Sequence, residues 1–177
     1  MTVEPASSTS APLVESISRI TELGILPVVE IGDLAHAEPL YEALSGGGLP
    51  AAEITVRTAA LEVINVLTHS HPEGFIGAGT VRTTADAARA VDAGAQSVVS
   101  PGTDPDVIAY CLERDVLAVP GACTPTEVGW DLRAGANLLN FFPAEASGGT
   151  AVLKGPGRPR PGRLLCAHWW YQQYEPG

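Results

Sequence analysis

Glu53 and Arg57 are the residues in this chain best suited to acid–base chemistry on a charged ligand. Glu53 and Thr55 alternate with Ile54 and Val56, so on an extended strand one of these pairs faces the interior of the fold. A buried carboxylate is costly unless it is hydrogen-bonded or has a task. Glu53 is therefore either a general acid and base tuned by burial or a structural carboxylate paired with Arg57. Arg57 either holds a carboxylate or phosphate group bidentately or forms a salt bridge on the rim.

Later in the chain, short turns rich in Gly, Pro and hydroxyl groups offer close backbone approach to a small ligand. These turns lie at 77–80, 100–102 and 120–124, and Asn140 and Glu145 lie on either side of Phe141-Phe142-Pro143-Ala144. Each turn is a weak signal alone, because tight connections between strands and helices favour Gly and Pro anyway. They become candidates only if the fold brings them together.

The cysteines and histidines form no recognisable ligand set. The three cysteines are odd in number and widely spaced (Cys111, Cys123 and Cys166), which fits neither a disulfide framework nor a metal motif. We expect Cys111 to be buried on a helix, Cys123 to be a loop thiol, and His69 and His71 to be solvated. We therefore predict no metal and no other cofactor. The chain has one lysine, Lys154, so a mechanism that needs a lysine amine must use that residue.

The elements that would position these residues follow a regular alternation. Six apolar stretches of strand length lie at 24–29, 51–56, 74–79, 97–100, 116–119 and 137–141. Helical patterns lie at 13–20, 34–44, 58–70, 83–93, 104–114 and 124–134, and Asp33 and Thr58 are placed to cap two of their starts. Such alternation predicts an α/β fold with a parallel sheet. Six units without a dinucleotide-binding fingerprint favour a TIM-type (β/α)8 barrel, whose catalytic residues lie at the carboxyl ends of its strands.

Composition limits the class of protein. The chain has 177 residues, of which 45% are hydrophobic and 17% are charged, as in an ordinary globular domain. No apolar run reaches the roughly 18 residues of a membrane span, so we expect a cytoplasmic protein that does not act on membranes. A net charge of −10 argues against nucleic acid as a partner. We predict a lead-in at 1–12 without fixed structure, a barrel at 13–154 and an aberrant tail at 155–177.

Several segments together resemble one family. They are Pro27-Val28-Val29, Glu53-Ile54-Thr55-Val56-Arg57-Thr58, Gly77-Ala78-Gly79-Thr80-Val81, Ser100-Pro101-Gly102, Pro120-Gly121 and Phe141-Phe142-Pro143-Ala144-Glu145. In order and spacing they resemble the 2-keto-3-deoxy-6-phosphogluconate (KDPG) aldolases, also called bifunctional 4-hydroxy-2-oxoglutarate (KHG) aldolases. The likeness runs from about Ile20 to Lys154.

The resemblance implies a class I aldolase on a (β/α)8 barrel, usually a homotrimer. Such an enzyme cleaves KDPG to pyruvate and glyceraldehyde 3-phosphate, or KHG to pyruvate and glyoxylate, through a lysine Schiff base. It implies that Glu53 transfers protons and that Arg57 and Thr80 contact the substrate carboxylate. Pro101, Pro120 and Phe142 would line the keto-acid pocket.

Two features depart from the family pattern. The family's Schiff-base lysine falls on Asn140, whose amide nitrogen is not nucleophilic. After Lys154 the sequence no longer resembles the family, although members continue through a seventh and an eighth strand and a Pro-Thr-Gly-Gly-Ile turn. These departures leave other interpretations open. The chain is either an active aldolase, an inactive truncated remnant that binds keto acids or pairs with intact subunits, or an enzyme of metal-dependent enolate chemistry built on Glu53.

The tail at 155–177 has the pattern of a shifted reading frame. Codons for the six residues at 155–160, read one base later, can spell Ala-Leu-Ala-Gly-Pro, the family's usual continuation. The codons of Trp169 and Trp170, read the same way, give Gly-Gly, and the flanking codons allow Pro-Thr before it and Ile after it. We therefore hypothesise a frameshift at about Gly155 in the gene or its sequencing. A naturally divergent tail is the alternative, and the nucleotide sequence distinguishes the two.

Overall fold

A curved parallel sheet forms the centre of the molecule. The computed structural model describes residues 9–57, 59–149, 151 and 164–167. In this part of the chain the strands are β1 (Val28–Val29), β2 (Ala51–Thr55), β3 (Phe75–Gly79), β4 (Ser97–Val99), β5 (Leu117–Val119), β6 (Gly121–Ala122), β7 (Leu138–Phe141) and β8 (Leu164–Ala167). They pair in the order β1-β2-β3-β4-β5 and β6-β7-β8, and the pairs are parallel. Strands that follow one another in sequence are therefore neighbours in space, as in a TIM-type barrel.

Pro120 divides one strand position into β5 and β6. The sequence pattern ends the fifth strand at Pro120, but the chain continues as β6, whose Gly121 and Ala122 pair with Asn140 and Phe141. Proline has no N–H to donate, yet its carbonyl still accepts a hydrogen bond from the Asn140 N–H (2.8 Å). The predicted end of this strand was therefore too early, and the sheet continues from β5 through β6 to β7.

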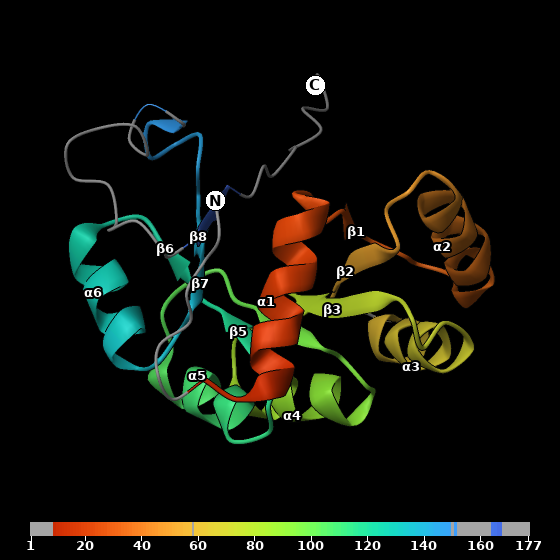
Figure 1. The fold of residues 1–177 in the computed structure, drawn as a ribbon, viewed down its shortest axis with the longest axis horizontal. Helices are drawn as coiled ribbons and strands as arrows, with labels where there is room; N and C mark the ends of the chain where they lie inside the picture. Colours follow the sequence, from red (N-terminus) through yellow and green to blue (C-terminus); the bar gives the residue numbers. More distant parts are fainter. Residues whose placement is uncertain (1–8, 58, 150, 152–163, 168–177) are drawn as a thin grey trace, which may run out of the picture.

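The helices that connect these strands cover the outer face of the sheet, and the first helix, which precedes the strands, lies against its inner face (Figure 1). They are α1 (Ala11–Leu23), the 3-10 turn η1 (Leu34–His36), α2 (Ala37–Gly46), α3 (Ala60–Ser70), α4 (Thr84–Asp92), α5 (Pro105–Leu112) and α6 (Pro125–Arg133). The predicted cap Asp33 accepts a hydrogen bond from a backbone N–H of its own first turn. Thr83, Asp104 and Thr124, where three helices were predicted to start, act as caps in the same way. The other predicted cap, Thr58, lies outside the described residues.

The core has two parts, one on each face of the sheet. Outward-facing strand residues such as Ile54, Ile76 and Val98 pack against the surrounding helices. On the inner face, Leu13, Ile17 and Ile20 of α1 form a second cluster with inward residues of the strands. Four of these begin their strands (Ala51, Phe75, Leu117 and Leu138), and two end β4 and β5 (Val99 and Val119). Helix α1 therefore closes the amino-terminal end of the inner face.

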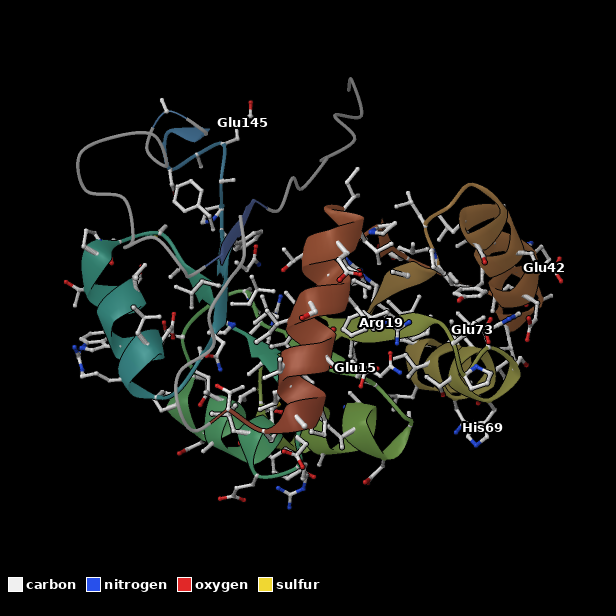
Figure 2. The ribbon with its side chains drawn as sticks, viewed as in Figure 1. Glu15, Arg19, Glu42, His69, Glu73 and Glu145 are labelled. Atoms are coloured by element: carbon white, nitrogen blue, oxygen red, sulfur yellow. The ribbon has the colours of Figure 1, made fainter. Side chains whose placement is uncertain are left out.

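Arg19 links α1 to the start of β3 and to the turn before it. Its guanidinium donates to the backbone carbonyl of Glu73, and its Cζ lies 5.6 Å from the centre of the Phe75 ring. Figure 2 shows Arg19 on the side of α1 that faces the Glu73 turn. Helix α1 begins at Ala11, inside the lead-in expected at 1–12, whose first eight residues lie outside the described part. Helix α1 therefore does not cover the carboxyl-terminal ends of β2 and β7, where polar side chains lie.

The two ends of the strand order differ from the interior of the sheet. At one end, Val28 in β1 is 44% exposed, and Ile25 and Leu34 beside it are 61% and 37% exposed. At the other end, β8 pairs with β7, although the sequence pattern indicated no strand there. Lys154 and most of the predicted tail at 155–177 lie outside the described residues, and the frameshift hypothesis stays a prediction. Among the described residues, no helix is both long and apolar enough to cross a membrane.

Candidate active site

Glu53 is a buried carboxylate without a partner. It lies in the middle of β2, is only 4% exposed, and forms neither a hydrogen bond nor an ion pair with any described residue. Burial disfavours the charged form and raises the pKa of the Glu53 carboxyl to about 7. The group can therefore both take up and release a proton near neutral pH, as general acid–base catalysis requires.

Glycines make the room that the Glu53 side chain occupies. A Cβ atom at Gly79 of β3 would collide with the Glu53 carboxylate, and one at Gly77 would collide with the Ser97 hydroxyl of β4. Glycine is the one residue that allows such close approach. The Glu53 carboxylate and the Ser97 hydroxyl thus fill the room that the missing side chains of Gly79 and Gly77 provide on the inner face.

Asn140 is the second buried polar group without a partner on this face. It lies in β7, is 4% exposed, and its Oδ1 has no hydrogen-bond partner among the described residues. An unpaired buried polar atom costs about 1–3 kcal/mol. Groups left in this state occur where a ligand is expected to supply the missing partner.

Strand register brings Glu53 and Asn140 to the same height. Across the sheet, Glu53 pairs with Gly77, Gly77 with Ser97, and Ser97 with Leu117. In a TIM-type barrel, neighbouring strands are staggered by about one residue. Because β5 and β6 occupy one strand position, β7 lies four positions from β2. A stagger of one residue per position shifts the level by four residues, from Leu117 to Gly121, and Gly121 pairs with Asn140. The carboxylate and the amide therefore lie at one level of the inner wall.

Arg57 does not neutralise Glu53. Its Nε lies 3.2 Å from Oε1 of Glu30, and the two side chains are 53% and 58% exposed. Of the two interpretations of Glu53, the structure removes the one that paired it with Arg57. Arg57 itself is at the carboxyl end of β2, where it forms the expected rim salt bridge and where an anionic ligand would compete with Glu30 for it.

The remaining candidates lie at the carboxyl ends of the strands. Thr80 follows β3 with a φ of 61°, a conformation rare for a β-branched residue and typical of functional sites. Pro120 is buried, Pro101 and Phe142 are half-buried, and the carbonyl of Pro101 lies so close to Gly121 that a Cβ there would collide with it. Glu145, by contrast, is exposed and points outward (Figure 2).

Comparison with known proteins identifies the family and the fold of the chain. Residues 16–161 match the KDPG and KHG aldolases. A 2-dehydro-3-deoxy-phosphogluconate aldolase of Treponema pallidum is 40% identical over 146 residues, which are 82% of this chain and 68% of that protein. The chain belongs to the KDPG and KHG aldolase family. The Pseudomonas aeruginosa aldolase is also 40% identical, and the match covers 82% of this chain and 66% of its relative. The chain thus spans about two thirds of the length of these relatives.

Solved structures of aldolases share the fold. The KDPG aldolase of Legionella pneumophila, with pyruvate captured as a covalent carbinolamine, superposes with a TM-score of 0.79 at 32% identity, covering 89% of this chain and 75% of that one. The Zymomonas mobilis enzyme with 3-phosphoglycerate gives a TM-score of 0.72 at 36% identity, covering 78% and 66%. The TIM-type fold and the family expected from the sequence are thereby confirmed.

Some polar residues of this aldolase-family chain escaped the sequence analysis. Ser97 shares the inner face with Glu53, and its buried hydroxyl has no hydrogen-bond partner among the described residues. Residues two apart on a strand share a face, so the spacing of Ser97 and Val99 could have indicated that both point inward. Asp131 on α6 is fully buried, and burial raises the pKa of its carboxyl to about 6. No sequence signal marked Asp131, because it lies within an ordinary helical pattern.

Predictions for the other reactive residues had mixed outcomes. His71 is not solvated as expected: its Nε2 lies 2.6 Å from Oε2 of Glu38, and its ring stacks on Tyr41. Cys111 is buried on α5 as expected, and burial raises the pKa of its thiol to about 11. Cys123 lies in the loop before α6. The described residues contain no group of three or more His, Cys, Asp or Glu side chains placed to hold a metal ion.

Proposed function

We propose that this protein acts on a 2-keto acid at the carboxyl ends of its strands, in the retro-aldol reaction of its family. The substrate would be KDPG, cleaved to pyruvate and glyceraldehyde 3-phosphate, or KHG, cleaved to pyruvate and glyoxylate. The observation that carries the proposal is the buried, unpartnered Glu53 carboxylate, whose pKa of about 7 suits proton transfer at neutral pH. The Legionella pneumophila relative, with pyruvate captured in its crystals, supports a keto-acid pocket.

The residues of the pocket have separate roles in this proposal. Glu53 takes the proton of the substrate's C4 hydroxyl as the C3–C4 bond breaks, and later returns a proton to C3 of the product. Arg57 and Thr80 hold the substrate carboxylate, for which Arg57 must exchange Glu30 for the ligand. Pro101, Pro120 and Phe142 line the apolar side of the pocket.

Asn140 favours a second candidate function, keto-acid binding without turnover. The family's imine requires an amine at this position, and an amide nitrogen cannot form it. Lys154 is the chain's single lysine, and we propose that it does not replace the missing one. A chain with Glu53 but no imine would bind a keto acid and release pyruvate slowly or not at all.

One set of variants separates the two functions. Pyruvate release from KDPG and from KHG is followed with lactate dehydrogenase for the wild type, Asn140→Lys, Glu53→Gln and the double variant. Asn140→Lys, with the reading frame after Lys154 restored, is expected to raise release by several orders of magnitude, and Glu53→Gln on that background to lower it by about 10²-fold or more. Pyruvate with sodium cyanoborohydride should add a covalent adduct to the Asn140→Lys variant only. If that variant gains neither adduct nor activity, the site is wrongly assigned.

We also propose a cytoplasmic homotrimer, as the family resemblance implies. Sedimentation equilibrium of the purified chain and of the frame-restored chain tests the assembly. A frame-restored chain that sediments as a monomer contradicts the trimer.

A further inference from the structure

We infer that the Asn140 amide and the Glu53 carboxylate together enolise a bound 2-keto acid without a covalent intermediate. The inference rests on the proposed keto-acid pocket and goes beyond it, because it gives the Asn140 position a chemical role of its own. The activity expected is exchange of the methyl protons of pyruvate with solvent, with no imine and no net consumption of pyruvate.

The first support is that both groups are free to act on a ligand. Glu53 and Asn140 are each 4% exposed, and neither the Glu53 carboxylate nor the Asn140 side-chain amide, Nδ2 as well as Oδ1, forms a hydrogen bond with a described residue. A side chain with a structural role at such depth is normally hydrogen-bonded. Together with the Ser97 hydroxyl, these unpaired groups on one wall cost stability, and the carboxylate and the Nδ2–H donor point to a ligand that pairs with both.

The second support is their placement. Strand register and barrel stagger put the carboxylate and the amide at one height, and the absence of a side chain at Gly79 lets the Glu53 carboxylate lie against β3 on this wall. A small planar keto acid between them would direct its carbonyl oxygen to the amide and its methyl group to the carboxylate. A neutral amide N–H fixed at a developing oxyanion stabilises it most in a water-poor site.

The proposed step balances without any further reactant. The Glu53 carboxylate removes a proton from the methyl carbon of pyruvate and becomes a carboxylic acid. The C–H electron pair forms the C2=C3 double bond, the carbonyl π electrons move to oxygen, and the enolate oxygen accepts a hydrogen bond from Nδ2–H of Asn140. Reversal returns a proton, or a deuteron in heavy water, to the carbon.

An amide can assist enolisation although it is not nucleophilic enough to form an imine. Enolisation needs a donor to the carbonyl oxygen and a base near the carbon, and it does not need an amine. Burial raises the pKa of Glu53 to about 7, which makes its carboxylate a stronger base than an exposed glutamate. The amide replaces the electron sink of an imine with a weaker, non-covalent one, so exchange will be slow compared with an imine-forming aldolase.

Proton NMR of pyruvate in deuterated buffer at pH 7.5 tests the inference. The methyl signal is expected to decay faster with the wild type than in buffer, and Asn140→Leu or Glu53→Gln to lower the enzymatic rate by about 10²-fold. Asn140→Asp, which keeps the shape but replaces the donor with a carboxylate, should lose the activity as well. Asn65→Leu and Glu62→Gln, both exposed on α3, are the matched controls and should exchange at the wild-type rate. Circular dichroism confirms that each variant folds.

Three outcomes overturn the inference. They are a wild-type rate equal to buffer, full activity in folded Asn140→Leu, and activity abolished by cyanoborohydride with an adduct on Lys154 by mass spectrometry. Saturation-transfer NMR with pyruvate separates this failure from that of the proposed function. If pyruvate binds but its methyl protons do not exchange, the non-covalent enolisation is wrong and the proposed keto-acid pocket is retained. If pyruvate does not bind, the keto-acid function fails as well.

Discussion

On β2 and β7, the two ends of the inner face of the sheet differ sharply in polarity. At the amino-terminal end, Ala51, Phe75, Leu117 and Leu138 pack under Leu13, Ile17 and Ile20 of α1. Toward the carboxyl-terminal end, β2 and β7 carry the buried polar residues Glu53, Thr55 and Asn140. On β2 and β7 the change takes place within two residues, from Ala51 to Glu53 and from Leu138 to Asn140, because inward residues recur every second position. On β4 the order is reversed, since Ser97 begins the strand and Val99, which ends it, belongs to the α1 cluster.

This difference separates the source of stability from the source of chemistry. The strands are joined by backbone hydrogen bonds at both ends, so the two ends differ only in their side chains. The apolar end buries large surfaces at about 25 cal/mol per Å², which offsets the cost of unpaired polar groups at the other end. Substitutions at the apolar end should therefore change the free energy of unfolding, and those at the polar end should change chemistry and its pH dependence.

Truncating the apolar end should have the largest effect on stability. Phe75 is fully buried in β3, so Phe75→Ala is expected to lower the free energy of unfolding by about 3–5 kcal/mol. Ile25→Ala is the control, because Ile25 is 61% exposed and should cost about 0.5 kcal/mol or less. Urea denaturation followed by circular dichroism measures both. Equal losses would show that the apolar end is not the stabilising part.

Removing the Glu53 charge should stabilise the protein at alkaline pH. The folded-state pKa is raised from 4.5 to about 7, so between these values only the unfolded chain releases the proton and stability falls as pH rises. The fall is complete above about pH 7 and amounts to roughly 3 kcal/mol at most. Glu53→Gln is expected to remove this fall.

Urea denaturation at pH 5 and pH 8 tests this expectation. Asp131, whose pKa is also raised, to about 6, contributes a similar fall at lower pH in both proteins, so the difference between wild type and Glu53→Gln isolates Glu53. Parallel pH profiles for the two proteins would mean that the Glu53 carboxylate is solvated or paired.

Local patterns in the sequence predicted most of the framework. Runs such as 74–79 are apolar throughout because both faces of a parallel sheet are covered, and the predicted cap Asp33 accepts a hydrogen bond from the Ala35 N–H. The continuation of the strand after Pro120 was missed, because a proline that cannot donate can still sit in a strand and accept through its carbonyl.

Pairing between distant residues was less predictable. Sequence alternation put Glu53 on the inner face, but it could not decide whether Arg57 or no residue would pair with it, since Glu30 comes from another strand end. His71 was misjudged for the same reason: its partners Glu38 and Tyr41 lie on α2, about thirty residues earlier. Contacts of this kind depend on tertiary placement, which single-residue propensities do not encode.

A methyl group at Gly79 should disturb the polar end at a smaller cost in stability. Gly79→Ala places a Cβ against the Glu53 carboxylate, so the side chain must move, and the crowding is expected to cost about 1–3 kcal/mol. Any proton exchange or lyase activity that depends on Glu53 should fall with it. Gly129→Ala on α6, where an added Cβ meets only Arg133 Nη1, is the control and should leave activity unchanged. Full activity in a folded Gly79→Ala variant would mean that the position of Glu53 is not critical.

The rim pair should give the smallest change in stability and a clear result on ligand binding. Arg57 and Glu30 are both more than half exposed, so losing their salt bridge is expected to cost about 0.2–1 kcal/mol. If Arg57 holds the substrate carboxylate, Arg57→Ala should weaken pyruvate binding by about tenfold or more, because a charge-assisted hydrogen bond is lost. Glu30→Ala should leave binding equal or tighter, since it removes the competitor for Arg57. Titration by NMR of both variants decides between the two roles. If both variants bind pyruvate with the wild-type affinity, Arg57 has only a structural role in the rim salt bridge. If only Arg57→Ala loses affinity, the ligand-binding site includes the exposed Arg57 as well as the buried residues.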